Sequence, residues 1–258
     1  MKEIKVGIEL EGIYNDDLLS QSMSSQGGYG FNKGSPINSF WKHSTDGSLT
    51  SEGEYTHSKT AEIIQYPVVG RHRFVSSLKA FQELAQGNEL KDFVTFNKSC
   101  GCHIHFSIPE NLYKNLLVEK IEGMRENLFR KLKNSDLRKD LVNGIIKHYN
   151  RDYAKNVRRE DQQGIFKGNL DRRMELNVQS EIDNKGLEWR AFNLYGTKTW
   201  EEFYTLMDIG YDCIEEFIES LRNISIVDNI SVQTPKIPKP KTMIFTIPSL
   251  KRFKKCVI

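Results

Sequence analysis

The 258-residue sequence lacks the features that would place it in a membrane or hold it together with disulfides. No segment approaches the roughly 18 consecutive apolar residues that a membrane-spanning helix needs. Two of its four cysteines, Cys100 and Cys102, lie too close together for an easy mutual disulfide, and the others, Cys213 and Cys256, suggest no framework. The chain begins directly with an alternating strand, so we expect no signal peptide. These absences favour a reduced, cytoplasmic protein without a membrane partner.

The main body of the chain also lacks an excess of positive charge. The net charge is +3, but seven basic residues and no acidic residue lie between Lys236 and the last residue. Subtracting these seven charges leaves residues 1–235 with a net charge of −4. A broad basic surface for nucleic acid is therefore not indicated.

Proline divides the chain near residue 228. Four of the seven prolines lie at or after Pro235, among the basic residues, which predicts an extended segment. We therefore expect one folded domain over residues 1–228 and a basic, proline-rich C-terminal arm over residues 229–258. Docking on an acidic partner, nucleic-acid binding and packing against the domain remain open as roles for this arm.

The spacing of apolar residues predicts an α+β fold. Strands are expected at residues 4–11, 41–49, 60–66, 93–96, 102–108, 174–178 and 187–192, although 41–49 also fits a turn. Helices are expected at residues 71–86, 109–133, 136–149 and 199–221. Residues 15–40 and 150–170 are polar and are predicted to be long loops. Because strands come in antiparallel-looking groups separated by helices, we expect one antiparallel sheet with helices on one face.

The first predicted strand carries two carboxylates on one face. Apolar residues at positions 4, 6, 8 and 10 occupy one face, while Glu9 and Glu11 occupy the other. Carboxylates about 7 Å apart along a strand repel each other unless a cation lies between them, and a divalent metal is the usual cation. A solvated outer face is the alternative interpretation of this pair.

A second polar pair follows a glycine turn. His103 and His105 share one face of their predicted strand, whereas Cys102 faces the opposite way. Two histidines at this spacing favour a ligand site over ordinary core or surface histidines. A zinc site that uses Cys100 and Cys102 is the competing hypothesis, but Cys102 should point away from both histidines.

The last predicted strand carries Glu188 and Arg190 on one face, together with Phe192, while Trp189 faces the other way. The two charged residues form either a simple ion pair or, beside a metal and a nucleotide, a metal ligand and a phosphate ligand. Glu62 is a lone carboxylate in another predicted strand. Four polar residues near predicted turns or the last hairpin are weaker candidates: Asp46, Arg172, Arg173 and Asn177.

The polar faces of these strands should meet on one surface of the sheet, because each apolar face needs the helices. A surface lined with Glu, His and Arg suits a metal–phosphate site better than an apolar ligand pocket. Several carboxylates with a histidine suit Mg²⁺ or Mn²⁺ better than zinc.

The ordered set of these motifs resembles the amidoligase family, which belongs to the glutamine synthetase and glutamate–cysteine ligase superfamily of carboxylate–amine ligases. The resemblance runs from about Val6 to Asn193. The motifs that carry it are Gly7-x-Glu9-x-Glu11, Asp46-Gly47-Ser48-Leu49, Glu62, Cys100-Gly101-x-His103-x-His105-x-Ser107, Asn177 and Glu188-x-Arg190.

The resemblance implies a curved, funnel-like antiparallel sheet with helices packed on its outer face, in a ligase-like catalytic domain over residues 1–228. It implies ATP and Mg²⁺ as cofactors, with Mn²⁺ as an alternative ion. The metal ligands would be Glu9, Glu11, Glu62, His103 and Glu188. The nucleotide-binding residues would be His105, Arg190, Arg172 and Asn177. The catalytic residues would be Arg190, Arg172 and Asp46.

The implied reaction joins a carboxylate to an amine through an acyl phosphate, giving an amide or isopeptide bond. Small-molecule or peptide carboxylates and amines are the expected substrates, and a homo-oligomer is left open. Because an acyl phosphate hydrolyses readily, the 15–40 and 150–170 segments are candidate lids that exclude water. Two other functions stay open: a metal-dependent hydrolase that uses the same Glu/His cluster, and a non-catalytic binding protein on this scaffold.

Overall fold

One antiparallel sheet forms the centre of the fold. The computed structural model describes residues 4–24, 37–44, 58–149, 156, 158–161, 163, 175–179 and 186–231. Its strands are β1 Lys5–Asn15, β2 Trp41–Ser44, β3 Ser58–Gln65, β4 Val68–Val69, β5 Val94–Thr95, β6 Cys102–Ser107, β7 Leu176–Gln179 and β8 Gly186–Phe192. The main strand order is β2-β3-β1-β6-β8-β7, and the short β4 and β5 also pair with β1. Every pairing is antiparallel, as the sequence predicts.

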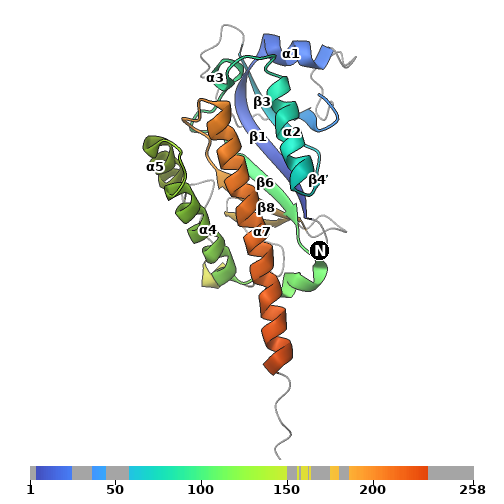
Figure 1. The fold of residues 1–258 in the computed structure, drawn as a ribbon, viewed down its shortest axis with the longest axis vertical. Helices are drawn as coiled ribbons and strands as arrows, with labels where there is room; N and C mark the ends of the chain where they lie inside the picture. Colours follow the sequence, from blue (N-terminus) through green and yellow to red (C-terminus); the bar gives the residue numbers. More distant parts are fainter. Residues whose placement is uncertain are drawn as a thin grey trace, which may run out of the picture.

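The larger helices pack on one face of this sheet (Figure 1). The helices are α1 Asp16–Ser24, α2 Arg71–Glu83, α3 Leu90–Phe93, α4 Val118–Lys133, α5 Lys139–His148 and α7 Trp200–Ser231, with short 3₁₀ helices η1 Glu110–Asn115 and η2 Arg159–Asp161. The long α7 lies across the middle of the sheet, with α2 and α4 on either side of it (Figure 1). The prediction of an α+β fold with helices on one face is therefore confirmed. No helix in the described part of the chain is long and apolar enough to cross a membrane.

The core lies between the sheet and α7. Ile8 and Leu10 of β1 and Ile104 of β6 are fully buried on the helix face, and each such side chain contributes about 1.5–3 kcal/mol by its burial. The approach of α7 is close at Gly210, where an added Cβ would lie 2.8 Å from Cδ1 of Ile104. Glycine is otherwise unfavourable within a helix, so this residue is explained by the tight contact with the sheet.

Two expected elements differ from the structure. The predicted loop over residues 15–40 contains α1, because the side-chain oxygen of Asn15 accepts the N–H groups of Asp17 and Leu18 and caps a helix. The predicted helix over residues 109–133 is interrupted after η1. There the buried Asn115 turns inward and donates to the carbonyl of Leu221 on α7.

Several predictions fall outside the described residues. Asp46, Arg172, Arg173, most of the 150–170 segment and the arm beyond residue 231 belong to this group. The expected domain boundary at residue 228 falls within the backbone of α7, which continues to its end at Ser231.

Candidate metal centre

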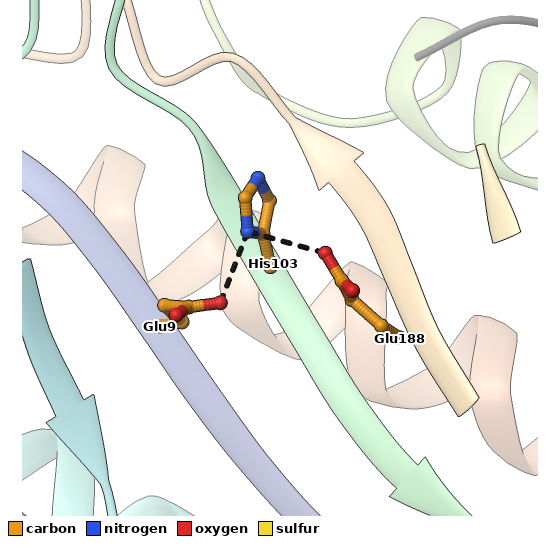
Figure 2. Close-up of side chains that lie close together, drawn as sticks. All are labelled: Glu9, His103 and Glu188. Atoms are coloured by element: carbon orange, nitrogen blue, oxygen red, sulfur yellow. Dashed lines mark hydrogen bonds and ion pairs between the residues drawn. The ribbon is translucent and has the colours of Figure 1, made fainter. Parts of the chain in front are cut away.

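The register of three neighbouring strands brings the predicted ligands together. Glu9 of β1 pairs directly with His103 of β6, and His105 of β6 pairs with Glu188 of β8. Directly paired residues project from the same face of a sheet, so these side chains meet on the face opposite the helices. Figure 2 shows Glu9, His103 and Glu188 converging from the three strands. The predicted common face is therefore confirmed for these residues.

Glu9, His103 and Glu188 lie close enough to hold one metal ion. Nδ1 of His103 lies 3.0 Å from Oε2 of Glu9 and 3.5 Å from Oε1 of Glu188 (Figure 2). One potential ligand atom from each residue lies within 4.8 Å of the other two. Two carboxylates and one imidazole fit Mg²⁺ or Mn²⁺, and three protein ligands leave coordination positions for water or substrate.

The Glu9 carboxylate is kept ionised in a largely buried position. Burial alone would raise its pKa, but hydrogen bonds with His103, His105 and Glu62 hold the pKa of Glu9 well below its ordinary value. His105 makes one of these contacts through Nε2, 3.0 Å from Oε2 of Glu9. An ionised carboxylate is the form that binds a metal, so these neighbours favour the site.

Glu11 and Glu62 surround the three ligands without joining the same tight group. The two residues pair directly across β1 and β3, and Glu62 reaches Glu9 by the side-chain hydrogen bond that helps to lower the pKa of Glu9. Oε2 of Glu11 accepts the backbone N–H of Gly101 at 2.6 Å. Four carboxylates thus gather on this part of the sheet, a charge distribution that favours a divalent cation.

Gly101 is the residue whose small size lets the turn approach this site. An added Cβ would lie 2.8 Å from Nε2 of His103 and 3.1 Å from Oε2 of Glu11. The glycine before the histidine strand is therefore required for space, which gives a physical reason for the Gly-x-His pattern.

Arg190 lies against two of the three proposed ligands. Its guanidinium contacts Nε2 of His103 at 3.1 Å and Oε1 of Glu188 at 3.0 Å. Because arginine only donates hydrogen bonds, Nε2 of His103 accepts and Nδ1 carries the proton that is shared with Glu9. A metal at Nδ1 would take the place of that proton. The arginine therefore lies beside the proposed metal position, where it could contact a metal-bound anion.

A β-bulge in β8, after Trp189, corrects one prediction. The pairing shifts between Cys102 and Ile104, so that Phe192 pairs with Cys102 and Trp189 pairs with Ile104. Phe192 therefore lies on the helix face, where its ring would be 3.1 Å from a Cβ at Gly210. The predicted common face for Glu188 and Phe192 is wrong, because period-two spacing fails at a bulge.

The structure does not support a zinc site with thiolate ligands from Cys100 and Cys102. Cys102 is fully buried on the helix face, and burial, followed by the charges of Glu11 and Glu9, raises the pKa of its thiol well above the ordinary value. The Cys100 thiol is also buried and contacts Oδ1 of Asn97 at 3.3 Å. Neither cysteine belongs to the group of three ligands found among the described residues.

The other predicted site residues are placed only in part. Asn177 pairs with Glu188 in the register of β7 and β8, next to the proposed site. Asp46 and Arg172 lie outside the described residues. Sequence reasoning did not identify Arg125, Tyr149 and Glu175, which form a buried polar group with Trp189 behind β8. Their positions in the sequence carry no common pattern, so no signal pointed to them.

Comparison of the chain with protein-family models gives no match, and no curated protein or solved structure matches it. The geometry of the site is therefore the basis for a functional proposal.

Proposed function

We propose that this protein is an ATP- and Mg²⁺-dependent carboxylate–amine ligase, with Mn²⁺ as the alternative ion. The observation that carries the proposal is the convergence of Glu9, His103 and Glu188 from three adjacent strands, with Arg190 against two of them. Such a group can bind a divalent cation and has a guanidinium in place for a phosphate bound to that cation.

The choice of a ligase rests on the resemblance of the ordered motifs to the amidoligase family. The proposal extends that resemblance to a curved, funnel-like sheet whose polar inner face holds the nucleotide. The antiparallel sheet with helices on the face opposite Glu9 and His103 supports this arrangement. Because the cytoplasm supplies ATP and Mg²⁺, we place the activity there.

The residues have separate roles in the proposed reaction. Glu9, His103 and Glu188 hold the cation, with Glu11 and Glu62 as further carboxylates around them. The bound cation would offset negative charge on phosphate and carboxylate oxygens. His105 and Arg190 would orient the nucleotide, and Arg190 would stabilise the phosphoryl group during its transfer to the substrate carboxylate. A small-molecule or peptide amine would then displace phosphate and form the amide or isopeptide bond.

The test is ADP release from the full chain with Mg²⁺, ATP and a panel of carboxylate–amine pairs. ADP release that requires both an acid and an amine supports the ligase. Absence of ADP release with every pair contradicts it, whereas cleavage of an amide or phosphoester without ATP would identify the hydrolase alternative. Retained Mn²⁺ and ATP binding without either reaction would identify a binding protein.

A pair of glutamate variants makes the assay specific to the proposed site. Glu188→Gln removes a ligand charge at the sheet, and Glu126→Gln makes the same chemical change at an exposed position on α4. We expect ADP release to be lost in the first variant and retained in the second. Equal activity of both variants would contradict the assignment of Glu188.

A further inference from the structure

Four polar side chains form a buried hydrogen-bonded chain behind β8, on the helix face of the sheet. Nε1 of Trp189 donates to the hydroxyl of Tyr149 at 2.9 Å. The Tyr149 hydroxyl in turn makes a side-chain hydrogen bond with Glu175. Arg125 of α4 donates to Oε1 of Glu175 at 2.5 Å. The chain therefore connects α4 and the C-terminal end of α5 to the strand that carries Glu188 and Arg190.

The direction of these hydrogen bonds follows from the chemistry of the groups. The indole of Trp189 only donates, so the Tyr149 oxygen accepts from it and uses its own proton toward Glu175. Burial, followed by the charge of Glu175, raises the pKa of the Tyr149 hydroxyl well above its ordinary value. The phenol therefore remains a donor, and the Glu175 carboxylate accepts from both Tyr149 and Arg125.

Glu175 is almost completely buried, with 1% of its surface exposed. A buried carboxylate is tolerated only when it is paired and hydrogen-bonded, and Arg125 supplies the opposite charge. An apolar pair of similar size could fill this space without that cost. Desolvation of this polar group therefore reduces the free energy of unfolding, in a core that is otherwise apolar on this face of β8.

The same residues contact the proposed site through the backbone. The carbonyl of Glu175 accepts the N–H of Arg190 at 2.9 Å, immediately before β7 begins. Trp189 lies between Glu188 and Arg190 in the chain, and its indole is held from the opposite face. A shift of Trp189 along or away from the sheet would therefore move both neighbouring side chains on the site face.

We propose that Arg125, Tyr149 and Glu175 are positioning residues that hold Glu188 and Arg190 at the metal centre from behind the sheet. The inference rests on the metal site of the proposed function and assigns a role to residues that touch neither metal nor substrate. Groups that hydrogen-bond directly to metal ligands change metal affinity by about 10–100-fold when they are removed, and an effect transmitted through Trp189 should lie at the lower end of that range. The bulge of β8 makes such support necessary, because a bulged strand has lost part of its regular pairing.

The alternative is that the group only stabilises the fold. A matched ion pair distinguishes the two roles: Arg138 contacts Glu202 at 2.5 Å, the same distance as Arg125 to Glu175. Glu202 is also buried, with 8% of its surface exposed, but the pair connects the start of α5 to α7. Its other hydrogen bonds go to Asp140, Gly196, Lys198 and Thr199, which lie outside β8. Arg138→Met is therefore the control for stability without positioning.

The experiment measures Mn²⁺ binding to the full chain by isothermal titration calorimetry, together with the thermal unfolding temperature. The main variant is Tyr149→Phe, which removes one oxygen atom and breaks the link between Trp189 and Glu175. Glu175→Gln is the second variant. It keeps the size of the side chain but removes the charge that pairs with Arg125, so the inference does not depend on a single substitution. We expect each to weaken Mn²⁺ binding about tenfold, whereas Arg138→Met lowers the unfolding temperature and leaves the affinity unchanged.

Each outcome decides between the two roles. Wild-type Mn²⁺ affinity in folded Tyr149→Phe and Glu175→Gln overturns the positioning role, and so does an equal loss of affinity in Arg138→Met. If the wild-type protein binds no Mn²⁺, both this inference and the proposed function fail. If Mn²⁺ affinity responds as expected but no ADP release is found with any substrate pair, the positioning role stands and only the ligase is contradicted.

Discussion

Along β1 and β6, alternate residues face two very different surroundings. Ile8 and Ile104 project toward α7 and are fully buried, whereas Glu9 and His103 project from the opposite face and contact each other. A shift of one residue in the pairing would exchange these faces and bury Glu9 against the helices. The apolar face therefore fixes the register, and the register in turn sets the distances between the proposed metal ligands. Stability and the proposed metal site therefore depend on different faces of the same strands.

The largest expected effect is on the helix face. Ile104→Ala removes a fully buried side chain that packs near α7, and we expect the free energy of unfolding to fall by about 2–5 kcal/mol. Urea denaturation measures this loss. The Mn²⁺ affinity of the remaining folded protein should be unchanged, because the residue projects away from Glu9. A loss of metal affinity without a loss of stability would contradict the division between the two faces.

The next effect should appear on the site face. Glu188→Gln removes one of three grouped ligands, and we expect the Mn²⁺ affinity to fall on the order of 100-fold, or about 2.7 kcal/mol. The free energy of unfolding should change little, since the glutamine oxygen can still accept from Arg190. Calorimetric titration, with Glu126→Gln as the control, measures the difference. A severe loss of stability with full metal affinity would show that Glu188 is a structural residue.

Glycine substitutions test how closely α7 packs on the sheet. In Gly210→Ala the new Cβ meets Ile104 and Phe192, and the overpacking of about 1–3 kcal/mol should outweigh a helix-propensity gain of about 1 kcal/mol. Gly144→Ala in α5 is the matched control, because its Cβ would meet nothing within 4 Å. Chemical denaturation should therefore show opposite signs for the two variants. A gain of stability in both would mean that α7 does not need the close approach.

The smallest expected effect is a gain of stability at the site itself. Glu62 pairs directly with Glu11 and hydrogen-bonds to Glu9, so two neighbouring carboxylates oppose its ionisation, and Glu62→Gln replaces it with a neutral side chain that can still donate to Glu9. In the presence of EDTA we expect the free energy of unfolding to rise by about 0.2–1 kcal/mol. Thermal unfolding with and without Mn²⁺ measures this rise, and Mn²⁺ should stabilise the variant less than the wild type. A lower stability in EDTA would indicate that the Glu62 carboxylate stabilises the fold.

Much of this arrangement could be predicted from the sequence because regular strands have a fixed period. The two-residue period of a strand correctly predicted that Glu9 faces away from the apolar residues of β1. It also correctly predicted that Cys102 and His103 lie on opposite faces of β6. The amphipathic pattern also predicted α7 in the correct place, apart from its later end. These features depend on neighbours in the chain, which the sequence displays directly.

The remainder depends on contacts between distant segments. The bulge that turns Phe192 toward α7 leaves no mark in the local pattern of β8. The chain of hydrogen bonds from Arg125 through Glu175 and Tyr149 to Trp189 joins four separate segments of the sequence. Asn115 likewise donates to a carbonyl of α7 that lies far from it in the sequence. Local propensity says nothing about such partners, so these positions could not be found from the sequence alone.

The central claim is that one divalent cation binds between β1, β6 and β8. The most direct test is a crystal structure of the full chain with Mn²⁺, in which anomalous scattering locates the ion. We predict an anomalous peak within about 2.5 Å of oxygen atoms of Glu9 and Glu188 and of a ring nitrogen of His103. A fully loaded crystal with no peak at these residues, or with its peak at Cys100, would contradict the account.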